Sequence, residues 1–271
     1  MSRARWFVFV SAVLLSLGAS RAIAQEHMDA TALAKQTQNP VADLTSIPFQ
    51  FNWNTGGVYE DRAFYNMNFQ PVFPMSVGKG AKLIARPIVP YLNIPTGTDE
   101  RETGIGDIQL QLYFTGANPG ATVLGLGPVF SFPTATNDLA RSGEWAAGPG
   151  AVIVKTAGPW VLGGLANQLW SFSHDGQGEK INQTTIQPFI NYNMGDGWAL
   201  STGPIITANW SAAEGEEWTV PLGAGITKTT MIGTRPTNLG IQYYNFVERP
   251  TGAAENQLRL VVGFLFPQKK G

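Results

Sequence analysis

Few residues in this sequence have the types and the spacing that catalysis requires. Ser171 and Ser173 precede His174 and Asp175, and a serine, a histidine and an aspartate are the groups that a hydrolase combines for nucleophilic attack. All four lie in one short stretch that runs into glycines, where little rigidity is available to orient the histidine. We therefore predict that the protein is not an enzyme and has no catalytic residues.

The sequence also offers few ligands for metals or cofactors. It has no cysteine and two histidines, His27 and His174, so neither a metal site nor a bound cofactor is expected. Acidic clusters occur at residues 99–102 and 214–217. They could bind divalent cations that bridge lipopolysaccharide, but solvated loop charges are the favoured interpretation.

The remaining charges of interest lie in segments where polar and apolar residues alternate. Such alternation is typical of a β-strand with one apolar face and one face that tolerates charge. In a barrel the polar face would line the lumen, and our candidate lumen-lining residues are Lys82, Arg86, Asp107, Gln109, Gln111 and Arg259. Arg86 and Asp107 fall on neighbouring strands and could pair across the interior. These charges either pack a narrow barrel or line a solute path, and we favour packing.

Twelve segments repeat this alternation, starting near residues 47, 65, 80, 105, 121, 146, 159, 183, 198, 217, 237 and 256. Their apolar faces carry no charge over the clearest stretches, as a lipid-facing surface requires. The links alternate between short Gly/Asn/Asp turns and longer polar loops, an asymmetry found in outer-membrane barrels. We predict an all-β fold: a single antiparallel transmembrane β-barrel of about twelve strands with a short N-terminal helical segment, both termini lying on the side of the short turns.

Aromatic residues stand near the expected strand ends. Trp and Tyr favour the headgroup level of a membrane, where the ring is buried and the polar atom stays wet. The candidate interface residues are Trp53, Trp198, Trp210 and Trp218. The last segment, "LRLVVGFLF", places Phe264 and Phe266 on its lipid-facing side and resembles the C-terminal signal read by the outer-membrane assembly machinery. Unlike that signal, it is followed by "PQKKG".

Seven prolines in or beside the strands oppose this interpretation, because proline removes a donor from the ladder. Each lies roughly five to nine residues from the nearest short turn, so together they could form one belt of bulges or broken pairing around the wall. Such a belt could splay the barrel or open a lateral path to lipid. The alternative, slightly favoured, is a set of individually tolerated kinks. The prolines are Pro71, Pro87, Pro128, Pro149, Pro188, Pro204 and Pro221.

Four regions follow from these patterns. Residues 1–24 combine Arg3 and Arg5, an apolar run and Ala22-Ile23-Ala24, which indicates a secretory signal peptide. Residues 25–46 form a periplasmic leader with a short helix from about Asp29, which either plugs the lumen or tethers there. Residues 47–267 form the barrel, and residues 268–271 form a periplasmic tail.

The amino-acid composition limits which classes of partner the protein can bind. Charged residues make up 14% of the chain and the net charge is −1, which argues against nucleic acid. We expect contacts with outer-membrane lipid and lipopolysaccharide, with the assembly machinery and with a small-molecule solute. A secreted β-sandwich that acts as a binding module is an alternative, although its surface would carry more Lys and Glu.

The stretch from Leu33 to Asn54, "LAKQTQNPVADLTSIPFQFNWN", and the later "QPVFPMS", "RPIVPYLNIP" and "GIGDIQLQLYF" resemble one family. It is the outer-membrane family associated with meta-pathway phenol degradation, often mislabelled neuromedin-U-like in bacteria. The resemblance covers most of the mature chain and brings no catalytic residues. It implies an outer-membrane barrel of a Gram-negative bacterium and a transport role for aromatic or other apolar compounds. We therefore predict a channel for passive uptake of small, apolar or aromatic solutes, with a barrel that transports nothing as the other alternative.

Overall fold

The computed structural model describes residues 30–57, 62–96, 99–117, 120–174 and 180–267. Residues 30–37 are helical, and no helix in this part of the chain is long and apolar enough to cross a membrane. A short 3-10 helix, η1, spans Asp138–Ala140. The strands are β1 (Leu44–Thr55), β2 (Phe64–Phe69), β3 (Phe73–Val77), β4 (Ala81–Pro95), β5 (Arg101–Ile105), β6 (Ile108–Gly116), β7 (Thr122–Phe132), β8 (Glu144–Ala157), β9 (Trp160–His174), β10 (Asn182–Gly195), β11 (Trp198–Thr202), β12 (Ile206–Asn209), β13 (Trp218–Ile232), β14 (Arg235–Glu248) and β15 (Asn256–Pro267).

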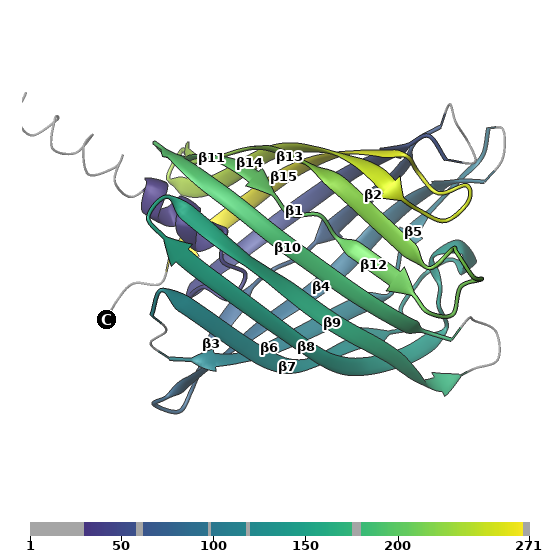
Figure 1. Ribbon diagram of the computed structural model, residues 1–271, viewed down its shortest axis with the longest axis horizontal. Coiled ribbons are helices and arrows are strands. Elements are labelled where there is room, and N and C mark those ends of the chain that lie inside the picture. The colour runs from purple at the N-terminus through teal and green to yellow at the C-terminus, as the bar shows by residue number, and fades with distance from the viewer. Residues whose placement is uncertain (1–29, 58–61, 97–98, 118–119, 175–179, 268–271) are drawn as a thin grey trace, which may run out of the picture.

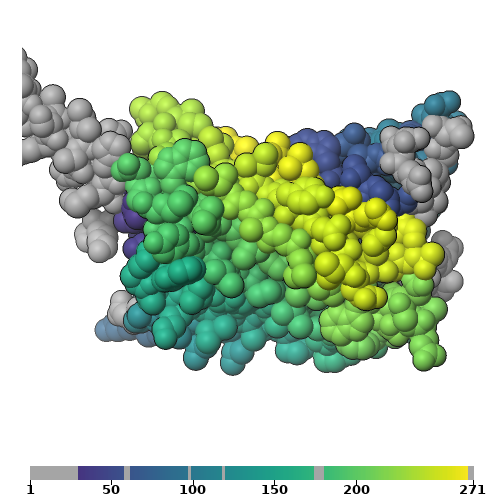
Figure 2. Space-filling view, turned by 45° about the horizontal axis from the view of Figure 1, so that its top comes forward, coloured from purple at the N-terminus to yellow at the C-terminus, as the bar shows by residue number. Residues whose placement is uncertain are grey.

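These strands form one antiparallel sheet that closes on itself (Figure 1). β15 pairs with β1 over its whole length, from Leu44 opposite Pro267 to Thr55 opposite Asn256, so the two ends of the sheet meet. Figure 2 shows this seam, where the yellow C-terminal strands border the blue N-terminal ones. Three wall strands are each made of two pieces, β2 with β3, β5 with β6 and β11 with β12, so the closed barrel has twelve wall strands. The predicted fold is confirmed.

The alternation seen in the sequence separates an outer from an inner face. Along β15, Leu258 and Phe264 are exposed on the outside, whereas Arg259 is 4% exposed on the inside. Leu126 of β7 is 67% exposed, and many other large apolar side chains share the outer face. A contiguous apolar surface of this extent is unfavourable in water and is the surface that hydrocarbon requires.

All seven in-strand prolines lie where the barrel wall loses pairing. Pro71 and Pro204 fall in the gaps between β2 and β3 and between β11 and β12. Pro87 faces the first gap, and Pro188 and Pro221 face the second, so each has a partner on one side only. The other two prolines, Pro128 and Pro149, lie opposite each other in the β7–β8 ladder. Pairing is interrupted in the β6–β7 ladder beside Pro128 and in the β8–β9 ladder beside Pro149. A missing N–H explains each lapse, and their common occurrence supports a belt over isolated kinks.

The N-terminal helix lies at the short-turn end of the barrel, at the left of Figure 1. The backbone N–H of Gly197, in the β10–β11 turn, donates to Thr31 Oγ1 at 3.3 Å. Gln38 and Asn193 exchange two side-chain hydrogen bonds of 3.0 and 2.9 Å. The part of the leader from residue 30 is therefore held at this mouth, while residues 25–29, the predicted signal peptide and the tail at residues 268–271 lie outside the described residues.

Candidate functional site

The lumen at the short-turn end is filled by an apolar cluster. Ile84, Tyr113 and Val161 point inward from three strands and are fully buried. Val41, which follows the N-terminal helix, belongs to the same cluster, so the leader contacts this end of the barrel by packing as well as by hydrogen bonds. A second cluster joins Ala42, Leu44 and Leu265, with Leu33 packed against it.

Beside the apolar cluster, and sharing Val72, Leu165 and Phe189 with it, lies a cavity of about 210 Å³. Residues 36–40 of the leader line it, together with inward side chains from most of the barrel wall. The lining is rich in amides, and its charged members, Arg86 and Arg259, are both arginines. Apolar side chains share the same walls; they are Leu44, Val72, Leu165, Phe189 and Val261.

Arg259 is held by neutral acceptors. Its Nε donates to Asn52 Oδ1 at 3.1 Å, its Nη1 to the Gly203 carbonyl at 3.0 Å and its Nη2 to Gln257 Oε1 at 2.9 Å. The guanidinium also lies 4.5 Å from the centre of the Tyr244 ring, a cation–π distance. The Gly203 carbonyl is available because it falls in the gap between β11 and β12, so the broken ladder provides part of this site.

Arg86 is 8% exposed and has a single hydrogen-bond partner among the residues that the structure describes. Its Nη1 donates to Gln111 Oε1 at 2.8 Å, which also accepts from the Tyr113 hydroxyl at 3.4 Å. Its Nε is buried without an acceptor. The pair with Asp107 suggested by the sequence does not form, because the ladder sets Arg86 opposite Gln111 and leaves Asp107 in the gap between β5 and β6.

The other candidate lumen residues have separate surroundings. Asp107 organises the loop after β7: its carboxylate accepts from the backbone N–H groups of Ala135 at 3.0 Å and Ser142 at 2.8 Å. Lys82 forms an ion pair with Asp43 of the leader near the short-turn mouth. Gln109 lies on the inward side of β6 with Gln111, but has no part in the cavity lining.

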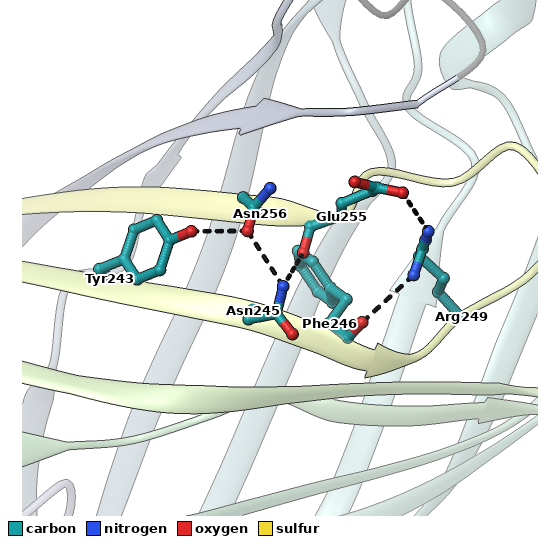
Figure 3. Close-up of polar contacts among 6 residues, drawn as sticks. All are labelled: Tyr243, Asn245, Phe246, Arg249, Glu255 and Asn256. Carbon is teal, nitrogen blue, oxygen red and sulfur yellow. Dashed lines mark hydrogen bonds and ion pairs between the residues drawn. The ribbon is translucent and has the colours of Figure 1, made fainter.

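A second hollow, of about 380 Å³, lies at the loop end of the barrel and has mostly apolar walls. We call it the vestibule; its apolar lining residues are Phe64, Ile94, Pro95, Phe246, Ala253 and Ala254. One wall is the β14–β15 loop, which Figure 3 shows in detail. Arg249 pairs with Glu255 and also donates to the Phe246 carbonyl, and Asn245 donates to Asn256 Oδ1 at 3.0 Å. These contacts keep the loop at the mouth.

Loop carboxylates are engaged by protein donors. Glu216 accepts from the Thr251 hydroxyl at 2.6 Å and from its backbone N–H, which joins the β12–β13 loop to the β14–β15 loop. The side-chain hydrogen bond and then the backbone one lower the pKa of Glu216 from its usual value. No group of three potential metal ligands occurs among the residues that the structure describes. The Ser–His–Asp stretch lies at the loop end of β9, and Asp175 falls outside the described residues.

Tryptophans on the outer surface lie at both ends of the wall. Trp198 lies near the short turns, with Lys228 4.9 Å from its ring centre. Near the loops, the rings of Trp210 and Trp218 meet edge to face at 5.6 Å, and Trp53 meets Tyr65 at 6.4 Å. On the last strand, Phe264 is exposed outside the barrel and Arg235 covers the Phe266 ring at 4.6 Å.

Several residues of the site were not expected from the sequence. Gln242 and Tyr244 lie on the inward side of β14, and Asn52 on that of β1; the alternation could have identified all three as inward-facing. Nothing in the alternation distinguishes cavity residues from those of the apolar cluster, because both use the same face.

Comparison with known proteins identifies a matching family and several solved structures with a similar fold. Residues 34–230 match a family described as "Putative MetA-pathway of phenol degradation". An outer membrane channel from Pseudomonas putida F1 superimposes with a TM-score of 0.62 at 15% identity, covering 82% of this chain and 95% of the channel. A KdgM porin gives 0.48 at 8% identity, covering 82% and 99%. Outer membrane phospholipase A from Escherichia coli gives 0.45 at 13% identity, covering 83% and 90%.

These structural likenesses concern the fold, and no curated protein matches the chain. A closed barrel with an apolar outer face belongs in the outer membrane of a Gram-negative bacterium. The family match spans more than half of the sequence, including the leader from Ala34 and the wall as far as Thr230. The chain therefore belongs to the family described as putative MetA-pathway of phenol degradation.

Proposed function

We propose that the protein is an outer-membrane channel for passive uptake of small, apolar or aromatic solutes and has no enzymatic activity. The observation that carries the proposal is the succession of spaces along the lumen: an apolar vestibule at the loop end, then a partly polar cavity. An apolar vestibule favours entry of apolar solutes, since it takes their surface out of water. The association of the family with phenol degradation and the likeness to an outer membrane channel support the same proposal.

The leader acts as the gate of this channel. It closes the short-turn end through Val41 in the apolar cluster and through the Gln38–Asn193 hydrogen bonds, all of which are non-covalent. Transport then requires the leader to move, because residues 36–40 line the lumen cavity at this end. Barrels with about 8–12 strands are narrow enough for side chains to fill them, so a small movement of this segment decides whether the channel conducts.

Cross-linking the gate tests this function. Cysteines introduced by Gln38→Cys and Asn193→Cys would be joined by a short bis-maleimide, which links the leader to β10, and the protein has no other cysteine. The reagent is needed because the two facing amides hold their Cβ atoms farther apart than a disulfide spans. In planar bilayers we expect the wild type and the untreated double variant to conduct, and the cross-linked double variant to conduct at least about tenfold less. The single variant Gln38→Cys treated with the bis-maleimide is the matched control. A wild type that stays silent at every voltage and salt contradicts the channel function.

The substrate and the membrane partners need separate assays. A strain lacking the protein should grow more slowly on at least one aromatic carbon source, and the wild-type gene should restore growth. We further propose that Phe264 and Phe266 present the signal for the assembly machinery and that the outer loops contact lipopolysaccharide. Replacing both phenylalanines by alanine should lower the amount of folded barrel in the membrane; an unchanged amount contradicts that role.

A further inference from the structure

The lumen cavity that residues 36–40 help to line carries two positive charges, and no carboxylate of the described residues lines it. The two charges belong to Arg86 and Arg259. Arginine stays protonated in proteins, so both guanidiniums remain charged. A buried charge without a partner is costly, and proteins normally supply a counter-charge. The chain does so at Lys82, which pairs with Asp43 at the mouth, but not at these two arginines.

The two arginines are not equivalent. Arg259 has an acceptor for each of its three nitrogens, so its charge is fixed in the wall. Arg86 uses Nη1 for Gln111 and leaves its buried Nε unpartnered. The planar guanidinium presents parallel N–H groups that match the two oxygens of a carboxylate. Arg86 therefore has an unsatisfied donor, which a turn of its side chain would present to an anion, while Arg259 adds a fixed positive field in the same cavity.

The apolar part of the lining favours a solute whose remainder, apart from the anionic group, is apolar and small. Val72, Leu165 and Phe189 lie in the same cavity as Arg86. Its volume of about 210 Å³ is below the ~300 Å³ at which pockets for drug-sized ligands begin. A small molecule with an apolar body and one carboxylate fits both features, whereas a cation or a large polar solute fits neither.

We propose that this cavity is a selectivity site for small organic monocarboxylates, with Arg86 as the residue that binds the carboxylate. The inference rests on the proposed channel function and narrows its solutes to anionic ones. In the wall of a lumen shielded from bulk water, the two charges attract anions and repel cations more strongly than they would in water. The open channel is then anion-selective.

Reversal potentials in planar bilayers test the site, with potassium benzoate as the probe and potassium chloride in parallel. We expect the wild type to favour benzoate over potassium and over chloride. Arg86→Gln should lower the benzoate-to-potassium permeability ratio at least about tenfold, which corresponds to about 1.4 kcal/mol. Arg86→Lys should keep most of the preference. Lys155→Gln, which removes a charge from the exposed outer side of β8, is the matched control and should change nothing.

The outcomes separate this inference from the channel function. A wild type that conducts without anion preference, or an Arg86→Gln variant that matches it, overturns the site and leaves the channel. An equal preference for chloride overturns the carboxylate assignment. If the wild type does not conduct, calorimetric titration of the solubilised protein with benzoate decides: binding that Arg86→Gln abolishes supports the site, and absence of binding overturns it. Arg86→Met replaces Arg86→Gln if the latter does not fold.

Discussion

At the scale of single residues, glycines beside the prolines allow the wall to close despite its broken ladders. Gly148 precedes Pro149, and a Cβ at Gly148 would lie 1.8 Å from the Gln168 carbonyl oxygen. Gly127, before Pro128, approaches the Leu112 carbonyl in the same way, at 1.9 Å. Strands that lack a ladder hydrogen bond are thus packed backbone to backbone, which only glycine permits here.

Gly148→Ala should therefore destabilise the barrel. The added methyl has no room, and overpacking costs about 1–3 kcal/mol in a packed interior. Gly80→Ala is the control, because nothing lies within 4 Å of a Cβ at that turn position. Unfolding by urea in the presence of lipid vesicles measures both. A Gly148→Ala midpoint equal to that of the wild type would show that the wall relaxes there freely.

At the scale of the elements, the interrupted strands determine where the wall can open. Ile88 and Phe189 lie next to Pro87 and Pro188, opposite the two main gaps, so the wall beside them is paired on one side only. By contrast, the ladder between β8 and β9 is continuous from Gly150 to Ala157. Unpaired amides near a cavity exchange with water more readily than amides in intact ladders.

Hydrogen exchange should accordingly be fastest in the middle of the wall and not at the strand ends. We expect peptides covering residues 86–89 and 187–190 to exchange at least about tenfold faster than peptides covering 150–157. Mass spectrometry in lipid nanodiscs provides the measurement. Uniform protection along β4 and β10 would indicate that the wall has no weak level and would argue against the proline belt.

At the scale of the whole molecule, closure depends on a contact between the two ends of the barrel sequence. β1 and β15 pair over twelve residues each, and this seam removes the exposed edges of the sheet. Their inner faces also share the Arg259–Asn52 hydrogen bond. We therefore expect the barrel to unfold as one unit and not as a string of independent hairpins.

We expect the intact barrel to resist detergent and to fractionate with membranes. On a gel with SDS, the unheated protein should migrate faster than the boiled protein, because the closed sheet stays folded and binds less detergent. Replacement of residues 256–267 by a Gly/Ser sequence should abolish the difference, since it removes the seam. Recovery of the wild type in the detergent-free soluble fraction would contradict the membrane barrel.

Much of this architecture could be predicted from local pattern. Period-two alternation identified the inward side of β6 and β15, and turn chemistry gave the order of short turns and long loops, because both depend on residues close in sequence. The division of β2/β3, β5/β6 and β11/β12 was harder to predict. A proline shows that a backbone N–H is missing from the sheet, but it does not show which neighbouring strand loses its pairing partner. Only the strand register of the structure showed that prolines of other strands lie opposite the gaps.

The sequence by itself determined that the protein has an outer face without charge over its clearest stretches, an inner face that carries the polar residues of the strands, and about twelve strands joined in a closed wall. These properties follow from side-chain alternation, because successive residues of any extended strand point to opposite faces. Only the tertiary structure decided that Arg86 faces Gln111 instead of Asp107, that the leader enters the apolar cluster through Val41, and that the cavity holds two arginines without a carboxylate. Those facts depend on strand register and on contacts between residues more than a hundred positions apart, and no local pattern carries that information.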